Sequence, residues 1–331
     1  MDGMNNPGRR LRSVSGSPHT RLLGLGSALP DRVVSNHDLA SVLDTSDEWI
    51  RSRVGITHRR YAGPEISVAD LAVEAGGKAL ADAGVDPSGV DTVIVATCTM
   101  PAPIPNAAAQ VADRIGIRAS GAFDLNAACA GFCYAVNTAS DLVRSGSAGH
   151  VLVIGAEKLT DWVNPSDRNT AIIFGDGAGA TLVGPSDEPQ IGPVVWGSAG
   201  DRVSTVGIWD RTYLEQDGLS VYRWATETAA PVAARAVERA GLRLSDIDAL
   251  VPHQANLRIV DSIAKQLKAD GARSDLVVAD DIAESGNTSS ASIPLALDHM
   301  RAAGRIAGGD ILLLIGFGAG LSYAAQVVIC P

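Results

Sequence analysis

The sequence has few cysteines and no excess of positive charge, and these absences exclude several classes of protein. Its formal net charge at pH 7 is −10, so it lacks the cationic excess with which nucleic-acid-binding proteins neutralise phosphates. The cysteines form no Cys-x-x-Cys pair and suggest no disulfide framework, so we expect reduced thiols and a cytoplasmic location. The four cysteines are Cys98, Cys129, Cys133 and Cys330.

Long uninterrupted apolar runs are also absent. The longest apolar stretch, residues 310–329, contains glycines and polar residues, which suits a buried pair of strands better than a membrane span. Residues 1–20 are polar and rich in Gly, Ser, Asn and Arg, so they lack the apolar core of a secretion signal. We interpret residues 1–20 as a loose N-terminal tail, and we expect neither a membrane nor a nucleic acid as a partner.

The chain does contain enough apolar sequence for a large core. Of its 331 residues, 46% are hydrophobic, and short β-branched runs alternate with alanine-rich stretches of helical character. Apolar strands between helices imply a sheet covered on both faces, hence an α/β fold with layered helices and sheets. The expected strands lie at residues 91–97, 150–156, 247–253 and 310–316.

Two pairs of stretches are similar to each other within the chain. Residues 79–97 align without a gap with residues 236–254: in each, a helix ending in Ala-Gly precedes a polar turn, an aspartate and a strand. Residues 175–183 and 316–324 form a second pair that keeps the same order. The pairs favour a duplicated unit, and the alternative is two similar βαβ crossovers.

A duplication would divide the chain near residues 185–195. We therefore predict an N-terminal half at residues 21–188, which contains the candidate nucleophile discussed next, and a C-terminal half at residues 189–331. Sites in such folds tend to lie just after the strands, so we searched those positions for reactive side chains.

The segment FDLNAACAGFCYA, residues 123–135, places two thiols among alanine and glycine. Asn126 is a good N-cap residue, so we predict that Cys129 occupies the first turn of a helix, where the helix dipole would lower its thiol pKa. Cys133 lies one turn further in, where burial is the better interpretation, as it is for Cys98 and Cys330. Since most free cysteines are small buried hydrophobes, this segment alone leaves a nucleophile as the minority interpretation.

A histidine and an asparagine elsewhere in the chain could serve such a thiol. His253 lies at the carboxyl end of an expected strand in VPHQANLR, and Asn287 follows Gly286 at an expected helix start in ESGNTSSASIP. In a papain-like arrangement, Asn orients His and the pair activates Cys for peptide hydrolysis. In a condensing arrangement, His and Asn both donate hydrogen bonds to a thioester carbonyl and stabilise an enolate as carbon dioxide leaves. Spacing does not choose between them.

Taken together, the motifs resemble the 3-oxoacyl-[acyl-carrier-protein] synthase III family of the thiolase-like fold over about residues 20–330. The resemblance implies two duplicated βαβ-rich halves in a five-layered α/β/α/β/α architecture, without metal or cofactor beyond a CoA thioester substrate. The motifs that carry it are NAACAGF, VPHQANLRI, GNTSSASIP, TSDEWIRSRVGITHRR, DRNTAIIFGDGAGA and GFGAGLSYAAQVV.

The resemblance implies a role for each residue at the centre of the site. Cys129 would take the acyl group from an acyl-CoA, and His253 and Asn287 would bind the thioester carbonyl of malonyl-[acyl-carrier protein] during decarboxylation. The backbone N–H groups of Cys129 and Ala319 would form a second oxyanion site. Phe317 would exclude water near the sulfur. The product would be a 3-oxoacyl-[acyl-carrier protein] that starts fatty acid or polyketide synthesis.

The resemblance also implies binding residues around the entrance. Trp49, Arg53 and Arg168 would grip the CoA nucleotide by stacking and charge pairing, and Asn256 would bind the pantetheine amides. Arg258 would contribute to a basic rim that meets the acidic carrier protein. The residues assigned to that rim are Gln254, Ala255, Asn256, Leu257 and Arg258.

Two regions concern the acyl group. Residues 196–222 are shorter than the corresponding region of many relatives, where that region forms part of the pocket wall. The tip of the acyl pocket is expected to involve the partner subunit of a homodimer through residues 101–108. Ile104 stands there at a position where relatives differ between a large aromatic and smaller residues, which predicts room for an acyl group larger than acetyl.

Three other functions compete with condensation. An acyltransferase of secondary metabolism would keep the fold and pass the acyl group to an alcohol or amine. A non-catalytic thiolase-like scaffold and a cysteine hydrolase are the remaining alternatives. The joint presence of Cys129, His253 and Asn287 favours condensation over all three.

Overall fold

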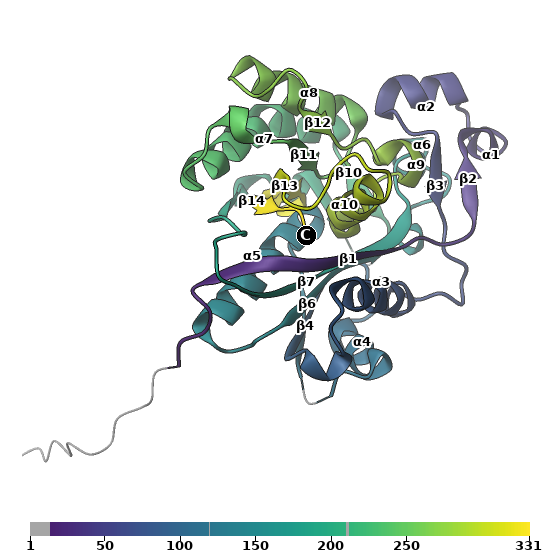
Figure 1. Cartoon of the computed structure of the whole chain (residues 1–331). Helices are drawn as coiled ribbons and strands as arrows, with labels where there is room; N and C mark the ends of the chain where they lie inside the picture. The colour runs from purple at the N-terminus through teal and green to yellow at the C-terminus, as the bar shows by residue number, and fades with distance from the viewer. Residues whose placement is uncertain (1–13, 119, 210–211) are drawn as a thin grey trace, which may run out of the picture.

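The computed structural model describes residues 14–118, 120–209 and 212–331 (Figure 1). Most of the expected tail, residues 1–13, lies outside the described residues. The first strand, β1 (His19–Ala28), begins two residues before the expected start of the N-terminal half and pairs along its length with β7 (Asp176–Ser186).

Two five-stranded sheets of identical topology organise the chain. The first has the order β1-β7-β6-β4-β5 and the second the order β8-β14-β13-β11-β12, and corresponding neighbours run in the same relative directions. The predicted duplication is therefore confirmed. The other strands are β4 (Thr92–Ala96), β5 (Gly121–Leu125), β6 (Val151–Lys158), β8 (Val195–Ser198), β11 (Ala249–Pro252), β12 (Val277–Val278), β13 (Ile311–Gly318) and β14 (Ser322–Ile329).

One of the two sequence pairs corresponds in structure and the other does not. Residues 79–97 and 236–254 both run from the end of a helix through a 3₁₀ turn into a strand, as predicted. Residues 175–183 form the start of β7, whereas residues 316–324 cross from the end of β13 through the turn η7 (Ala319–Leu321) into β14. The shared glycines of the second pair thus serve different local structures.

Three helical layers enclose the sheets, which completes the predicted α/β/α/β/α order (Figure 1). Helices α3 and α4 pack on the outer face of the first sheet, α5 and α10 between the sheets, and α7 and α8 on the outer face of the second. Their bounds are α3 (Val68–Ala83), α4 (Ala107–Ile115), α5 (Gly131–Ser145), α7 (Gly218–Arg239), α8 (Leu257–Ala269) and α10 (Ser292–Ala302).

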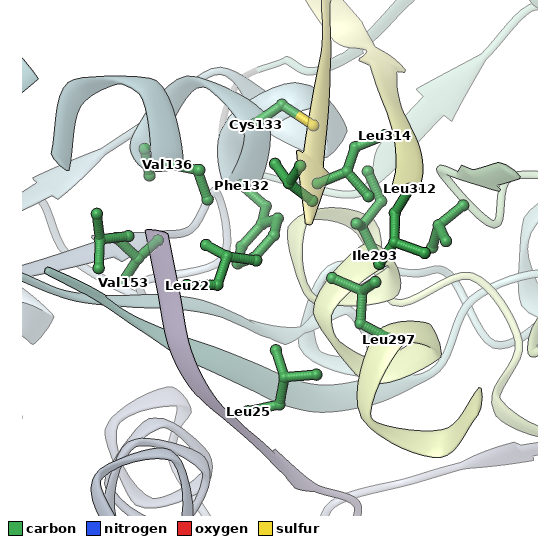
Figure 2. Close-up of a cluster of buried hydrophobic side chains, with 14 of the residues drawn as sticks. Leu22, Leu25, Phe132, Cys133, Val136, Val153, Ile293, Leu297, Leu312 and Leu314 are labelled. Atoms are coloured by element: carbon green, nitrogen blue, oxygen red, sulfur yellow. The ribbon is translucent and has the colours of Figure 1, made fainter. Parts of the chain in front are cut away.

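The central layer carries the largest buried cluster. Figure 2 shows Phe132 of α5 and Ile293 of α10 between leucines of both sheets, and each of these two side chains is at most 1% exposed. The helices approach the strands closely: a Cβ at Gly179 of β7 would lie 2.7 Å from the backbone N of Leu295 in α10. Glycine at that point is what lets α10 rest on the first sheet.

Shorter elements surround the sheet ends. Helix α2 (Asp47–Val54) begins after the N-cap Ser46 and ends at Gly55, which has a φ of 78°. The remaining elements are α1 (Asn36–Ala40), β2 (Val33–Ser35), β3 (His58–Arg60), α6 (Arg168–Ala171), β9 (Val206–Ile208), β10 (Leu214–Gln216) and α9 (Ile282–Ser285). Several of them supply residues of the site.

Two exclusions hold for the part of the chain that the structure describes. No helix there is long and apolar enough to cross a membrane, and residues 310–329 form the strands β13 and β14. No group of three or more His, Cys, Asp or Glu side chains is placed to hold a metal ion within these described ranges.

Candidate active site

A cavity of about 360 Å³ brings together the three residues predicted to react. Cys129 of the first half and His253 and Asn287 of the second half all line it. Phe317 and Ala319, at the end of β13 and the start of η7, also line it. The sequence prediction that these five residues share one site is thus matched by their placement.

Cys129 lies in a 3₁₀ turn, η2 (Ala128–Ala130), and not in the first turn of the helix. Asn126 does not cap α5; its side-chain oxygen accepts a hydrogen bond from the N–H of Ala128 at 3.1 Å. Ala128 has a φ of 46°, a left-handed conformation that non-glycine residues seldom adopt, and Ala130 stands at the N-cap of α5. The predicted N-cap role of Asn126 is therefore wrong.

Burial controls the protonation of the thiol. It raises the pKa of Cys129 to about 12, although a hydrogen bond from Ser289 acts in the opposite direction. The expectation that the helix dipole lowers this pKa is wrong, because loss of hydration outweighs it. Cys129 is therefore a neutral thiol in the free protein at pH 7, and its proton must leave as the sulfur attacks.

The other three cysteines differ in their surroundings. Cys133 is fully buried in the central cluster and Cys330 is 3% exposed, so both confirm the prediction of burial. Cys98 instead lines the cavity, and its Sγ lies 3.7 Å from Oγ of Ser289. Cys98 was also expected to be buried; it is half-buried and lines the cavity, so that expectation is wrong.

Gly318 provides the space beside the nucleophile. A Cβ at this glycine would lie 2.7 Å from Cβ and 3.0 Å from Sγ of Cys129. One residue further on, Ala319 begins η7 and lines the cavity, so its backbone belongs to the same wall. A side chain at Gly318 would fill the room that a thioester on the sulfur requires.

The sequence around Asn287 repeats the turn that holds Cys129. Asn287 accepts a hydrogen bond from the N–H of Ser289 at 2.8 Å, just as Asn126 accepts one from Ala128. Ser289, like Ala128, is left-handed, with a φ of 49°, and begins a 3₁₀ turn, η6 (Ser289–Ala291), that leads into a central-layer helix. The segments NAACAG and NTSSAS are thus two copies of one local structure, which the sequence analysis missed.

His253 follows the last residue of β11, as predicted, and is 2% exposed. Its Nδ1 lies 2.7 Å from Oγ of Ser292, which also accepts a hydrogen bond from the N–H of Gln254 at 3.3 Å. We assign the Ser292 hydroxyl as the donor to Nδ1, which leaves the ring proton on Nε2. Burial lowers the pKa of His253 to about 3, so the ring is neutral at pH 7 and can donate from Nε2.

Asn287 is held through its backbone and its side-chain oxygen. Its N–H donates to the carbonyl of Ile173 at 2.9 Å, and its own carbonyl accepts from the N–H of Gly175 at 3.0 Å. Because Ser289 occupies the side-chain oxygen, the NH₂ group remains as the donor for the cavity. His253 and Asn287 are thus two separate donors, whereas in a papain-like arrangement the Asn side-chain oxygen would bind the imidazole ring.

The residues expected to grip a nucleotide lie together at one surface. The guanidinium groups of Arg168 in α6 and Arg53 in α2 lie 4.8 Å and 5.7 Å from the ring of Trp49. Asn256, the N-cap of α8, donates from its side chain to the carbonyl of Arg53 at 3.2 Å. Asn256 also lines the cavity, so this cluster is continuous with the wall around the thiol.

The five residues predicted to meet a carrier protein are not alike. Arg258 is exposed, and its guanidinium lies 5.4 Å from the ring of Tyr222. Ala255, Asn256 and Leu257 are half-buried. Gln254 is fully buried, and its side chain bonds to the carbonyl of Pro252 at 2.8 Å, so its assignment to a surface rim is wrong.

The two regions expected to concern the acyl group lie apart. The β9–β10 hairpin of the short region 196–222 contributes Val206, Ile208 and Leu214 to the wall. Ile104 lies elsewhere, on the surface, where it is 80% exposed. Its predicted part in the pocket would need a partner subunit and stays a prediction.

Comparisons with known proteins agree on one family. The model for 3-oxoacyl-[acyl-carrier-protein (ACP)] synthase III matches residues 123–200, and the model for its C-terminal region matches residues 237–330. The chain is 47% identical over 344 residues to beta-ketoacyl-[acyl-carrier-protein] synthase III 1 of Streptomyces coelicolor, covering 97% of this chain and 99% of that protein. It is 51% identical over 318 residues to synthase III 4 of the same organism, covering 94% and 99%.

A solved structure supports the same conclusion. The priming beta-ketosynthase from the R1128 polyketide biosynthetic pathway matches with a TM-score of 0.93 at 44% identity, covering 98% of this chain and 99% of that chain. The similarity extends across both sheets and both halves of the cavity. Fold and sequence therefore point to the same group of relatives.

Proposed function

Because this chain belongs to the 3-oxoacyl-[acyl-carrier-protein] synthase III family, a family of acyltransferases, we propose that Cys129, His253 and Asn287 perform a decarboxylative condensation. Cys129 attacks an acyl-CoA and holds the acyl group as a thioester, while the thiol proton ends on the departing CoA. Malonyl-[acyl-carrier protein] then enters, loses carbon dioxide and attacks the acyl-enzyme. The product is a 3-oxoacyl-[acyl-carrier protein], and the Cys129 thiolate that it displaces takes up a proton from solvent to restore the free thiol.

The observation that carries the proposal is the pair of independent donors opposite a buried thiol. Nε2–H of His253 and the NH₂ group of Asn287 are both available to the cavity, as their other polar atoms are bound by Ser292 and Ser289. Two donors to one carbonyl oxygen stabilise the enolate that forms as carbon dioxide leaves. The N–H groups of Cys129 and Ala319 serve the oxyanion of the acylation step.

CoA and the carrier protein approach through the surface formed by α2, α6 and α8. The adenine stacks near Trp49 while Arg53 and Arg168 pair with phosphates, and the pantetheine chain runs past Asn256 toward the cavity. Arg258, exposed at the start of α8, attracts the acidic carrier protein. The reaction needs no metal or further cofactor in this scheme.

A homodimer is part of the proposal. Strand β5 forms an open edge of the first sheet, and its Phe123 is 37% exposed. An unpaired edge carrying an exposed aromatic side chain suits pairing with a second copy. Ile104, also exposed, precedes α4 in the same half, so a partner placed there would cover it. An intermediate side chain at Ile104 leaves room for acyl groups larger than acetyl.

Two measurements test the proposal. Mass spectrometry of the intact protein after incubation with mixed acyl-CoAs should show an acyl adduct that Cys129→Ser abolishes. Carbon dioxide release from malonyl-[acyl-carrier protein] separates condensation from acyl transfer to an alcohol or amine. We expect Asn287→Ala to acylate but to release carbon dioxide roughly 100-fold more slowly. A variant that lost acylation as well would contradict the role given to Asn287.

A further inference from the structure

Glu157, near the end of β6, carries a completely buried carboxylate beside the cavity. Its Oε2 accepts hydrogen bonds from the N–H of Cys98 at 3.1 Å and from the hydroxyl of Thr99 at 2.6 Å. Thr97 adds a third donor at 3.1 Å. Hydroxyl, amide and thiol groups donate to this buried carboxyl group, and the thiol of Cys98 reaches its Oε1 at 3.4 Å. Among the described residues, no Lys, Arg or His forms an ion pair with it.

The other carboxylate oxygen reaches into the second half of the chain. Oε1 accepts from the hydroxyls of Ser289 at 3.0 Å and Ser290 at 2.8 Å, both in η6. The backbone of η6 passes directly over β6, because a Cβ at Gly155 would lie 2.3 Å from the carbonyl oxygen of Ser290. Glu157 therefore bonds the turn after Asn287 to the first sheet.

Ser289 connects Glu157 to Asn287. Its hydroxyl donates to Glu157, and its N–H donates to the side-chain oxygen of Asn287. Ser289 must be left-handed for both bonds to form, with a φ of 49°, and this conformation is unfavourable for a residue with a Cβ. The carboxylate opposes that cost by bonding the hydroxyl, and the N–H then fixes which way the Asn287 amide points.

The corresponding position in the second half shows the difference between the two turns. Gly155 contacts the carbonyl of Ser290 in one half, and Gly316 contacts that of Cys129 in the other. Two residues beyond each glycine stand Glu157 and Gly318, respectively. Glycine leaves space beside the thiol, whereas the glutamate fills the equivalent space beside η6. The turn at Cys129 thus has free space beside it for substrate, whereas the side chain of Glu157 fills the space beside η6.

We propose that Glu157 is a positioning residue that fixes the Asn287–Ser290 turn and so aims the Asn287 amide at the thioester carbonyl during decarboxylation. It does not touch the substrate; it acts through Ser289. This inference rests on the proposed function, since it assigns Asn287 to the second step of the reaction. It predicts that Glu157 matters for decarboxylation far more than for acylation of Cys129.

Glu157→Gln tests this division of steps. The amide keeps the shape but cannot accept hydrogen bonds on both sides, so one group of donors is left without an acceptor. We expect carbon dioxide release from malonyl-[acyl-carrier protein] to fall roughly 100-fold, as for a displaced catalytic donor, while acylation of Cys129 and KM for acyl-CoA change less than about threefold. Rapid-quench mass spectrometry measures acylation, and trapped carbon dioxide measures decarboxylation.

A matched control and a second variant keep the test decisive. Asp176 is a buried carboxylate of β7 that accepts from Thr160 and Ala62 outside the cavity, so Asp176→Asn should lower both steps equally or neither. If Glu157→Gln does not fold, Ser290→Ala removes one of the hydroxyl donors to Glu157 at a residue that does not line the cavity, and it should also slow decarboxylation selectively.

The outcomes separate this inference from the proposed function. Equal losses in both steps for Glu157→Gln, or no loss in either, would overturn the positioning role. A wild-type protein that acylates Cys129 but releases no carbon dioxide would instead contradict condensation itself. A folded Glu157→Gln variant that loses decarboxylation but keeps acylation, beside an active wild-type protein, supports both the positioning role of Glu157 and the proposed condensation.

Discussion

At the scale of single residues, burial sets the protonation of both Cys129 and His253. It raises the pKa of the thiol to about 12 and lowers that of the imidazole to about 3, so both groups are neutral at pH 7. A neutral His253 with its proton on Nε2 is a hydrogen-bond donor over the whole range in which the protein is expected to work. The site thus relies on placed donors and not on a standing thiolate–imidazolium pair.

The pKa of Cys129 predicts how the thiol responds to pH. We expect alkylation of Cys129 by iodoacetamide to accelerate about tenfold per pH unit from about pH 6 to about pH 10, because only the thiolate reacts and its fraction grows until the pKa is reached. Mass spectrometry of the modified peptide at each pH gives the rate. A rate that levels off near pH 7 would show a far more acidic thiol and contradict this picture.

Arg168 tests the nucleotide surface. Its guanidinium lies 4.8 Å from the ring of Trp49, so Arg168→Ala removes the cation over that ring and, in the proposed binding mode, a partner for a CoA phosphate. We expect KM for acyl-CoA to rise about tenfold with little change in kcat. Arg51→Ala is the matched control, because Arg51 lies on α2 together with Trp49 but pairs with Asp47.

A truncated substrate completes that test. An acyl-N-acetylcysteamine thioester lacks the nucleotide, so Arg168→Ala and the wild-type protein should use it equally well. If the variant were equally impaired with the truncated thioester, Arg168 would act on the fold of the site and not on the nucleotide.

At the scale of elements, close approach between strands and helices is set by glycine. Gly179→Ala would place a Cβ 2.7 Å from backbone N of Leu295, and neither β7 nor α10 can move freely in the central layer. We expect a loss of about 1–3 kcal/mol in the free energy of unfolding, measured by urea denaturation. Gly77→Ala, on α3 with no atom within 4 Å of the new Cβ, should instead be neutral or stabilise by up to about 1 kcal/mol. Similar losses for both variants would contradict the packing argument.

The positions of strands and helices could be predicted wherever the local sequence determines them. Much of the fold was predictable in this way. The apolar strands and the place of His253 at the end of β11 follow from composition and periodicity. The turn at Cys129 could not be predicted in the same way, because Ala128 adopts a left-handed conformation that only surrounding contacts maintain. Asn126 precedes a run of helix formers, so the local sequence predicts an N-cap. In the structure its side-chain oxygen instead accepts a hydrogen bond from the N–H of Ala128.

The burial of two polar residues was also not predicted from the sequence. Gln254 looks like a surface residue by type, but its side chain bonds to Pro252 and to the N–H of Ile282 inside the protein. Glu157 gave no signal either, since its hydrogen-bond donors come from residues far apart in the sequence. Contacts between segments distant in the sequence determine both: Gln254 bonds to Ile282 within the second half, and Glu157 bonds to Ser289 across the two halves.

At the scale of the whole molecule, the two halves each contribute what the other lacks. The first half supplies the thiol and the second half supplies both donors to the proposed enolate, so the cavity depends on the central layer that joins the sheets. The proposed dimer is a further association of this kind, because the open edge of β5 would let the first sheet pair with a second copy of the chain.

Phe123 tests that association. We expect the wild-type protein to run as a dimer in light scattering coupled to size-exclusion chromatography, and Phe123→Asp to shift it toward a monomer, because a charge would be placed at the paired edge. Val33→Asp is the control, as Val33 of β2 is 48% exposed away from that edge. A dimer that persists in Phe123→Asp would exclude β5 as the contact.

The repeated Asn-centred turn also bears on descent. If a half-length chain paired with itself about a two-fold axis, it would present two identical turns toward a shared centre. In one polypeptide the two copies are free to differ, so one can keep a sulfur beside a glycine while the other keeps a hydroxyl beside a carboxyl group. Cys129 beside Gly318 and Ser290 beside Glu157 occupy equivalent places in the two halves, and the two places now serve different steps of the proposed reaction.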